Sequence, residues 1–348
     1  MIRLKEKSKV YIYAPSNFAT GGAELLHQLV HVLRQKSVDA YIVYFDYLTK
    51  SLDSKNNISN TPKEYLKYNI SVSEYVEDEE DNVIVFYEGI FYKSLTIEKS
   101  QIVLWWLSVD HFFLNDYNFK NLSFSDYWSW NKKLAIKVLI KRFSKLKYSK
   151  STYSLKKLKS KSTINCYQSI YAQNFLINNG FHEILPLSDY INKDFFDKDL
   201  TTAQRFNNIL YNPKKGIKST KKLISLRPDL NWIPLINMTR AELSKLMLKS
   251  KIYIDFGYHP GKDRFAREAA SCGCCVITNK KGSANFYEDV SIHSEYKFDK
   301  NNPKKILNCI DEIINKYESH IDNFSFYRER ILREETLFND EVEIVFNL

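Results

Sequence analysis

The feature that most constrains the fold is an apolar strand that leads through a glycine-containing loop into an amphipathic helix. Residues 9–15 are apolar, with β-branched and aromatic side chains, and the polar loop 16–22 follows them. The helix predicted from Ala23 carries apolar side chains at helical spacing, on one stripe: Leu25, Leu26, Leu29, Val32 and Leu33. Residues 39–47 predict the next strand. Such a strand–helix–strand unit predicts a parallel sheet with a right-handed crossover.

The same alternation continues through the first half of the chain. Its further predicted elements are strands at 82–89, 101–110 and 163–169 and a helix at 171–181. Gly180 is expected to close that helix, and residues 183–192 lead out of this half. The segment 193–207 is polar with little periodicity, and we interpret it as a linker.

A second series of the same kind follows the linker. Its strands are predicted to begin at Asn207, Asn231, Lys251 and Cys274, and its helices to cover 219–226, 239–250 and 264–273. Thr239 and Glu242 have the spacing of a capping box, and the chain from Pro303 onward is expected to be mainly helical.

The predicted fold class is α/β, with two Rossmann-like doubly wound domains that face a cleft. A length of 348 residues suits two domains, which we place at 1–195 and 196–348. For the last helix, the alternative to a place in the second domain is packing back on the first domain. Ligands of such sheets bind at the carboxyl ends of the strands, so we expect the site of this protein there.

Composition indicates the cellular compartment of the protein, the state of its cysteines and the charge of its partners. No apolar run reaches the length of a signal peptide or a membrane span, so we expect a cytoplasmic protein. Five cysteines do not indicate a disulfide framework, and Cys272, Cys274 and Cys275 are interpreted as small, buried, reduced thiols rather than a zinc site. The formal net charge of +10 favours anionic partners.

Two loops have the properties of anion sites. The loop 16–22 ends at a helix start, where backbone amides attract anions and Gly21 and Gly22 permit close approach. The segment between Gly257 and Arg264 joins a strand end to a helix start in the second domain. There Lys262 and Arg264 are candidates to bind a diphosphate. Glu268 lies one turn further on, where its carboxylate is placed to accept hydrogen bonds from ribose hydroxyls.

These motifs resemble those of the GT-B glycosyltransferases, especially the retaining family 4 type. The segments that carry the resemblance are Gly-Gly-Ala-Glu at 21–24, Pro-Leu-Ser-Asp-Tyr-Ile-Asn at 186–192, Leu-Tyr-Asn-Pro-Lys-Lys-Gly at 210–216 and Glu-Ala-Ala-Ser-Cys-Gly-Cys-Cys-Val-Ile at 268–277. The run His-Pro-Gly-Lys-Asp-Arg from His259 is similar to a divergent branch that builds capsules and other surface polysaccharides. The resemblance implies an acceptor-side first domain and a nucleotide-sugar-binding second domain.

The resemblance also implies roles for single residues. Glu268 matches the glutamate that holds the donor ribose, and Lys215, with Lys214, matches the lysine that binds the diphosphate. The family's first glutamate falls at Pro260, so His259 or Asp263 is expected to take over sugar contacts. The implied donor-binding set is Gly21, Gly22, Lys214, Lys215, His259, Gly261, Lys262, Asp263, Arg264 and Glu268.

The end of the strand 101–110 supplies the catalytic candidates Asp110 and His111. In the family a histidine near this point contacts the donor sugar, and an aspartate can orient or deprotonate an acceptor hydroxyl. In a retaining front-face reaction the leaving phosphate can take that proton itself, so no strong base is required. The alternative to a catalytic role for Asp110 is the structural role of a helix N-cap. No Asp-x-Asp motif follows a strand, so we expect neither a metal nor a cofactor besides the nucleotide-sugar donor.

A long basic stretch lies between the predicted strands 101–110 and 163–169. Residues 132–161 contain twelve Lys or Arg and no acidic residue. Wound as a helix, 132–147 has an apolar arc formed by Ala135, Ile136, Leu139, Ile140, Phe143 and Leu146, opposite lysines that include Lys133, Lys137, Lys141 and Lys145. One interpretation is peripheral binding to the anionic inner face of the cell membrane; the other is a surface helix packed on the first domain.

The function we expect is transfer of a hexose from a nucleotide sugar to a glycan or lipid-linked acceptor, in capsule or lipopolysaccharide synthesis. A nucleotide-sugar 2-epimerase of the same fold is one alternative, but Pro260 stands where its key carboxylate would be. A basic nucleic-acid-binding protein is the other. The lysine-rich stretch lacks a recognised nucleic-acid module, so no nucleic-acid partner is expected.

Overall fold

The computed structural model describes residues 2–16, 19–46, 51–52, 58–144, 153–161, 163–196, 200, 203–299 and 302–348. The chain divides into two compact units. The N-unit comprises Met1–Gln168, Ala172–Leu187 and Asn339–Leu348, and the C-unit comprises Ser169–Tyr171 and Ser188–Phe338. The main passage between the units thus lies at Leu187 and Ser188, eight residues before the boundary proposed at 195.

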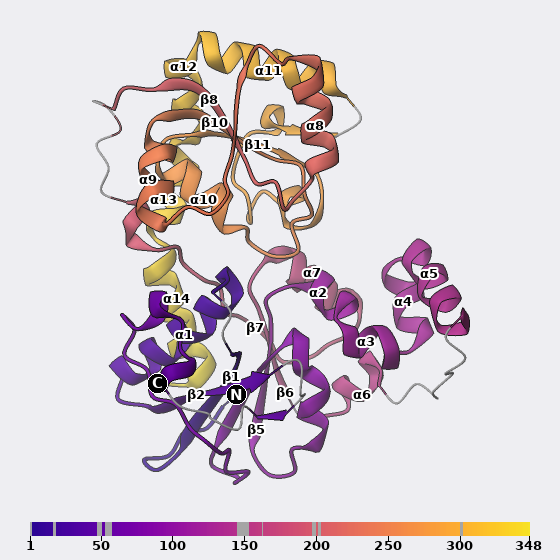
Figure 1. Ribbon diagram of the computed structural model, residues 1–348. Coiled ribbons are helices and arrows are strands. Elements are labelled where there is room, and N and C mark those ends of the chain that lie inside the picture. Colours follow the sequence, from indigo (N-terminus) through magenta and orange to yellow (C-terminus); the bar gives the residue numbers. More distant parts are fainter. Residues whose placement is uncertain are drawn as a thin grey trace. The chain divides into compact units, whose positions relative to one another are not determined.

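A seven-stranded sheet forms the centre of the N-unit (Figure 1). Its strands are β1 (Lys9–Pro15), β2 (Asp39–Asp46), β3 (Ser51–Leu52), β4 (Val83–Tyr87), β5 (Gln101–Trp106), β6 (Thr163–Tyr167) and β7 (Ile184–Pro186). They lie in the order β3-β2-β1-β4-β5-β6-β7, and all neighbours are parallel except β2 and β3. The order reverses between β1 and β4, which is the switch point where doubly wound sheets bind ligands.

Helix α1 (Gly21–Gln35) shows why this half folds as predicted. Thr20 caps its N-terminus, where the Thr20 hydroxyl accepts a hydrogen bond from the amide of Ala23. All five residues of the predicted apolar stripe are buried. Fully burying a leucine side chain contributes roughly 1.5–3 kcal/mol, so this stripe fixes the helix on the sheet.

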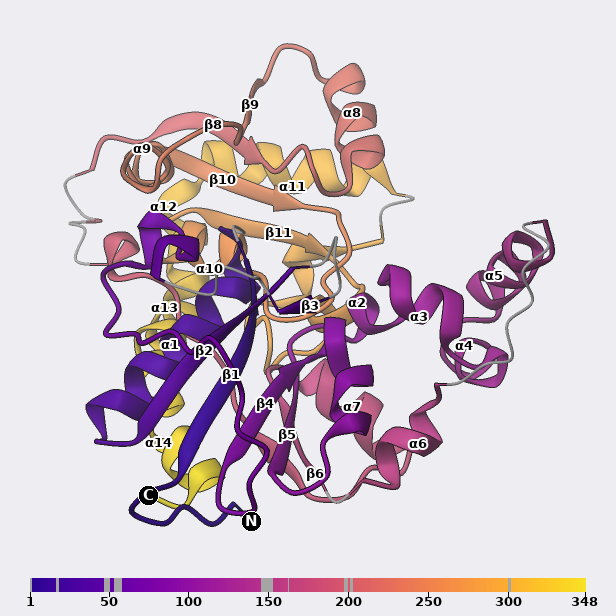
Figure 2. The same ribbon diagram turned by 60° about the horizontal axis from the view of Figure 1, so that its bottom comes forward.

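The helices that follow β5 include two predicted ones, α5 (Lys132–Ser144) and α7 (Ile170–Asn178), and others that the sequence did not predict. The others are α2 (Val109–Leu114), α3 (Asp116–Asn121), α4 (Phe124–Trp130) and α6 (Leu155–Lys159). Both ribbon views place α4 and α5 well outside the sheet of the N-unit (Figure 2).

A five-stranded, fully parallel sheet forms the centre of the C-unit. Its strands are β8 (Phe206–Tyr211), β9 (Asn231–Pro234), β10 (Ser250–Asp255), β11 (Cys275–Asn279) and β12 (Lys297–Phe298), in the order β12-β11-β10-β8-β9. Numbered along the chain, the order is 2-1-3-4-5. The switch point therefore lies between β8 and β10.

The helices of the C-unit confirm most of the local predictions. They are α8 (Ile217–Leu226), α9 (Arg240–Leu248), α10 (Arg264–Ser271), α11 (Pro303–Asn315), α12 (Tyr317–Ile321), α13 (Ser325–Leu332) and the first part of α14 (Glu334–Phe346). The capping box of Thr239 and Glu242 is present at α9. Gly273, at φ +85°, ends α10 as predicted, and all five cysteines are buried thiols without a disulfide.

Within the described part of the chain, we find no helix that is both long and apolar enough to cross a bilayer.

Candidate functional site in the C-unit

Two loops meet at the switch point of the C-unit. One joins β8 to α8 and carries Lys214 and Lys215; the other joins β10 to α10 and carries His259 to Asp263. Gly216 has φ +60°, and a side chain there would collide with the backbone of Phe256. Only glycine fits so close to another backbone in this conformation. The sequence therefore holds the two loops directly against each other.

The loop between β10 and α10 is also held by hydrogen bonds from Asn279 and Ser283. The Ser283 amide donates to the carbonyl oxygen of His259 over 2.8 Å, and the Ser283 hydroxyl donates to the carbonyl oxygen of Gly261 over 2.6 Å. The Asn279 side chain donates to the carbonyl oxygen of Gly257 over 2.5 Å. These bonds give the loop a defined shape without any ligand, which lowers the ordering cost of binding.

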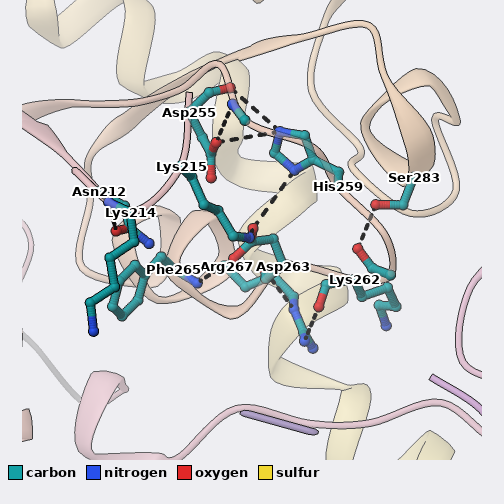
Figure 3. A network of polar contacts seen from close by, with 12 residues as sticks. Asn212, Lys214, Lys215, Asp255, His259, Lys262, Asp263, Phe265, Arg267 and Ser283 are labelled. Atoms are coloured by element: carbon teal, nitrogen blue, oxygen red, sulfur yellow. Dashed lines mark hydrogen bonds and ion pairs between the residues drawn. The ribbon is translucent and has the colours of Figure 1, made fainter. Parts of the chain in front are cut away.

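A chain of buried polar groups connects the two loops (Figure 3). Asp255 ends β10, and its Oδ1 lies 3.7 Å from Nε2 of His259. Nδ1 of His259 lies 3.9 Å from Oδ2 of Asp263, and Asp263 in turn forms an ion pair with the Lys215 ammonium group. His259 and Asp255 are fully buried, whereas Lys215 is half-buried. Lys214 points its charge to solvent.

The charges in this chain compensate one another. Burial disfavours the charged form of Lys215, but the attraction of Asp263 and Asp255 outweighs it and keeps the lysine pKa above its ordinary value. Burial likewise opposes ionisation of Asp263, but Lys215 and His259 hold its pKa below the usual range. For Asp255, burial and the neighbouring Asp263 raise the pKa.

This cluster has the composition of a cation site. Asp255, His259 and Asp263 form, among the described residues, a group of potential ligand atoms that all lie within 4.8 Å of one another. The Lys215 ammonium group lies beside this cluster as the ion-pair partner of Asp263.

Lys262 and Arg264, the predicted diphosphate contacts, take part in a second ionic cluster. Lys262 Nζ lies 2.9 Å from Glu334, and Nε of Arg264 lies 3.6 Å from Asp189. Arg267, on α10 and almost fully buried, joins both acids, at 2.8 Å from Asp189 and 2.6 Å from Glu334. The sequence identified neither acid as a partner, because they lie 78 and 67 residues away from Arg267.

Glu268 lies in the second turn of α10 and is buried. Its charge contributes to raising the pKa of the buried Tyr253, although burial and Asp255 contribute more. Tyr253 donates a hydrogen bond to Asp255 over 3.3 Å, so Glu268 belongs to the electrostatic surroundings of the same cluster.

The N-unit collects a separate group of predicted residues at its own sheet. Gly21 and Gly22 form the first turn of α1, with Gly22 exposed. Asp110, which is buried, and His111, whose side chain is 70% exposed, lie in the first turn of α2. The N-cap of α2 is Ser108, which corrects the alternative that gave this role to Asp110; the Ser108 hydroxyl accepts from the amide of His111.

Sequence reasoning missed Glu88, which directly follows the buried strand β4 at the switch point of the N-unit. Its Oε2 accepts a hydrogen bond from the amide of Leu107 over 3.2 Å, and its Oε1 lies 3.9 Å from Nδ1 of His111. Burial raises the pKa of Glu88 to about 8 in spite of these amides. An acidic residue placed immediately after a wholly apolar strand was the available signal.

The basic helix α5 differs from its predicted orientation. Ala135 and Val138 are fully buried, whereas Ile136 and Ile140, which the predicted apolar arc contained, are 48% and 62% exposed. The reason is that α5 packs on α4 through the side that includes Ala135, Val138 and part of Arg142. The side chain of Phe143 and residues Lys145, Leu146 and Lys147 lie outside the described residues.

The comparisons with known proteins concern the fold. No protein-family model matches the chain, and no curated protein sequence matches it. Solved structures do match. HepE from Anabaena in complex with UDP-glucose aligns with 12% identity and a TM-score of 0.60, over 98% of this chain and 100% of that one. Sucrose-phosphate synthase from Thermosynechococcus elongatus aligns with 10% identity and a TM-score of 0.62, over 98% of each chain.

A third similar structure is WaaG, a glycosyltransferase involved in lipopolysaccharide biosynthesis. It aligns with 10% identity and a TM-score of 0.52, over 96% of this chain and 99% of WaaG. Identities this low establish a shared architecture and not a shared substrate. The chain has the α/β fold of the GT-B glycosyltransferases, with one doubly wound sheet in each unit.

Proposed function

We propose that this protein transfers a sugar from a nucleotide-sugar donor to a glycan or lipid-linked acceptor, with retention of anomeric configuration. The observation that carries the proposal is the position of Lys215. It lies at the switch point of the C-unit, on a loop that Gly216 holds against the backbone of Phe256, directly after β10. Ligands of doubly wound sheets bind at this point, and the similar HepE structure contains UDP-glucose.

In this proposal the C-unit binds the donor. Lys215, assisted by Lys214, contacts the diphosphate, and Glu268 accepts hydrogen bonds from the ribose. His259, Gly261 and Asp263 contact the sugar or fix the loop that does. Lys262 and Arg264 are already paired with Glu334 and Asp189, so they support the site mainly by holding α10 in place.

The N-unit is proposed to bind the acceptor. Gly21 and Gly22 have no side chains that would keep the donor phosphates away from the first turn of α1. The positive end of the helix dipole at this turn favours the negative charge of the phosphates. Asp110 and His111 lie near the acceptor hydroxyl. In a retaining reaction the leaving phosphate accepts the proton of that hydroxyl, so no strong base and no metal is expected.

Calorimetry with UDP, GDP and ADP, each beside its nucleoside, tests the donor role. Lys215→Met should weaken a nucleoside diphosphate at least tenfold and the nucleoside hardly at all, because a charge-assisted hydrogen bond contributes roughly 1.5–3 kcal/mol. Lys222→Met, on the exposed side of α8, is the matched control. Glu268→Ala should weaken both ligands. The donor assignment is wrong if no nucleotide binds, or if Lys215→Met and Lys222→Met behave alike.

The helices α4 and α5 support the further proposal that the enzyme works at an anionic membrane surface. Ile136 and Ile140 are exposed beside Lys133, Lys137 and Lys141, and Trp128 is 44% exposed. The Lys132 ammonium group lies 5.7 Å from the centre of the Trp128 ring. An exposed mixture of apolar, aromatic and lysine side chains is typical of interfacial helices.

Sedimentation with phosphatidylglycerol vesicles tests this surface. The wild type should bind at low ionic strength and dissociate in salt, since each lysine contributes about 1 kcal/mol near such a surface. Lys137→Glu with Lys141→Glu should abolish binding, whereas Lys156→Glu with Lys157→Glu, on α6, should change it little. A wild type that stays in the supernatant at low salt refutes the membrane role.

A further inference from the structure

Glu88 connects the ends of two neighbouring strands of the N-unit. It directly follows β4 and begins the 3₁₀ helix η3 (Glu88–Thr96), and its side chain is only 6% exposed. Its Oε2 accepts the hydrogen bond from the amide of Leu107, the first residue after the adjacent strand β5. The backbone thus holds one carboxyl oxygen of Glu88, and the other oxygen, Oε1, faces His111.

This carboxyl group lies where the ligands of a doubly wound sheet bind. The strand order of the N-unit reverses between β1 and β4, and Glu88 stands at the carboxyl end of β4. The first turn of α1 is adjacent, because a side chain at Gly22 would come within 3.9 Å of the Leu107 side chain. Packing of the sheet does not require an acid here, since burying a carboxyl group costs free energy.

The buried carboxyl group holds its proton at neutral pH. Burial raises the pKa of Glu88 to about 8, against the opposing effect of the backbone amides of Glu88, Leu107 and Ser108. A neutral carboxylic acid has an O–H group that can donate a hydrogen bond. Glu88 can therefore act as a donor toward a neighbouring lone pair.

The elements packed around η3 supply few other titratable groups. They are β4, β5, α2 and α6. Tyr87 lies on β4, Lys93 on η3 itself, and Asp110 and His111 on α2, whereas β5 contributes apolar residues and one glutamine. The lysines of α6 are exposed. His111 is the group whose contact with the Glu88 carboxyl group is close enough to form an ion pair.

The ring of His111 presents one nitrogen to Glu88. Nδ1 lies 3.9 Å from Oε1, and Nε2 points in a different direction, away from the acid. The side chain of His111 is 70% exposed, so the ring has room to move. An approach of about 1 Å would close the contact to a hydrogen bond, and such contacts commonly tighten when a ligand binds.

We infer that Glu88 and His111 share one proton between Oε1 and Nδ1, and that this proton makes the outward Nε2 of His111 a hydrogen-bond donor to a hydroxyl oxygen of the bound sugar. Whichever atom carries the shared proton, Nε2 keeps its own hydrogen. The step moves one proton between two atoms and forms or breaks no other bond. Glu88 is therefore a positioning residue that acts through His111.

This inference rests on the proposed sugar transfer and makes the role of His111 more specific. A ring that donates from Nε2 orients a hydroxyl group and does not remove its proton. Deprotonation of the acceptor is then left to the leaving phosphate, as a retaining reaction allows.

Loss of the shared proton would reverse the ring. An ionised Glu88 accepts a hydrogen bond from Nδ1–H, which leaves a lone pair on Nε2. The donor form is therefore present at neutral pH and is lost as the pH rises through about 8. Glu88→Gln should keep the donor form at both pH values, because the Gln oxygen can accept from the amide of Leu107 while its NH₂ group donates to Nδ1.

NMR of ¹⁵N in the histidine rings, at pH 7 and pH 9.5, tests the shared proton without any ligand. A ring nitrogen that carries hydrogen differs clearly in chemical shift from one that does not, and His111→Gln identifies the signal of His111. In the wild type the hydrogen should lie on Nε2 at pH 7 and on Nδ1 at pH 9.5. In Glu88→Gln it should stay on Nε2. The exposed His182 should not reverse, and Glu98→Gln, at an exposed acid, should leave the reversal of His111 intact.

Turnover connects this proton to the reaction. Release of UDP, ADP or GDP from UDP-glucose, ADP-glucose and GDP-mannose is followed with water as the acceptor, while tryptophan fluorescence verifies that the protein stays folded. The wild-type kcat should fall about tenfold between pH 7 and pH 9.5, and that of Glu88→Gln less than twofold. Glu88→Leu, which cannot donate to the ring, should lower kcat about tenfold at pH 7, where Glu88→Gln stays close to the wild type.

The outcomes separate the inference from the function beneath it. A wild-type His111 ring that keeps its hydrogen on one nitrogen at both pH values overturns the inference, and so does a reversal that persists in Glu88→Gln. If Glu88→Gln does not fold, the comparison of His111 with His182 in the wild type decides. Equal pH profiles of turnover in the wild type and Glu88→Gln overturn the role in the reaction. If none of the three sugar nucleotides is consumed, the failure concerns the proposed function, and the ring spectra still decide whether the proton is shared.

Discussion

Replacing Glu88 with Gln should make the N-unit resistant to alkaline pH. Glu88 is buried at the end of β4, where the pKa of its carboxyl group rises from an ordinary value of 4.5 to about 8. The folded protein thus holds a proton that the unfolded chain loses above pH 4.5. This stabilising contribution is complete below pH 4.5 and is lost as the pH rises through 8.

The size of the effect follows from these two values. At 1.36 kcal/mol per pH unit, the total contribution is about 5 kcal/mol, since the group is buried and little screened by solvent. Between pH 6 and pH 9 the wild type should lose roughly 3 kcal/mol of this through Glu88 alone. Gln is neutral at every pH and keeps an oxygen that can accept from the amide of Leu107, so the variant should not lose this part.

Thermal unfolding at pH 6 and pH 9 is the assay. Trp105 and Trp106 are fully buried on β5, next to Leu107, and their fluorescence reports on this part of the N-unit. At 2–4 °C per kcal/mol, the melting temperature of the wild type should fall about 6–12 °C more than that of Glu88→Gln. Glu98→Gln changes an exposed acid as a control. Parallel losses in the wild type and Glu88→Gln would refute the reasoning.

Four further predictions concern stability and reactivity. Gly216→Ala should destabilise the C-unit by more than about 2 kcal/mol in urea. Gly180 has a similar φ, but a side chain there would meet only the end of Lys159, at 4.0 Å, so Gly180→Ala should cost only the backbone strain of about 1–2 kcal/mol; equal costs would argue against the loop contact. Glu334→Gln should cost roughly 3–5 kcal/mol in urea, because it leaves Arg267 with one acid. Arg267, Arg264 and Lys262 overcome burial and lower the pKa of Asp189, so its contribution is present above the ordinary carboxyl range and is lost as the pH falls below it. Asp189→Asn should therefore flatten the acid limb of the stability profile, measured by denaturation between pH 5 and pH 2. The five buried thiols should ignore a thiol reagent until the protein unfolds, and rapid labelling of the native protein would contradict their burial.

Local signals account for most of the fold. Alternating apolar strands and amphipathic helices predicted the main strands and helices on both sides of the linker, but not the short helices α2, α3, α4 and α6. Short-range rules gave the capping box at Thr239 and the helix end at Gly273. These features depend on residues within a few positions of one another, so the sequence contains all the information needed to place them. The same rules predicted loops at the carboxyl ends of the strands, and the candidate site of the C-unit lies in two of these loops.

Periodicity did not decide which side of α5 is buried. The helix has apolar residues around much of its circumference, and either side satisfies a helical pattern. Contact with α4 buries Ala135 and Val138 and exposes Ile136 and Ile140. A choice between two apolar sides depends on the neighbouring helix, which no pattern within 132–147 describes.

Charge pairing shows the same dependence on distant residues. The sequence correctly singled out Lys215, Lys262 and Arg264 as cations near a strand end, but it treated their charges as available to a ligand. The structure pairs Lys215 with Asp263, Lys262 with Glu334, and Arg264 with Asp189. It also buries Glu88 where its proton is retained. Coulombic partners and the desolvation of a carboxyl group depend on distances of a few ångströms between residues far apart in the chain, and only the folding of the sheets and their loops sets those distances.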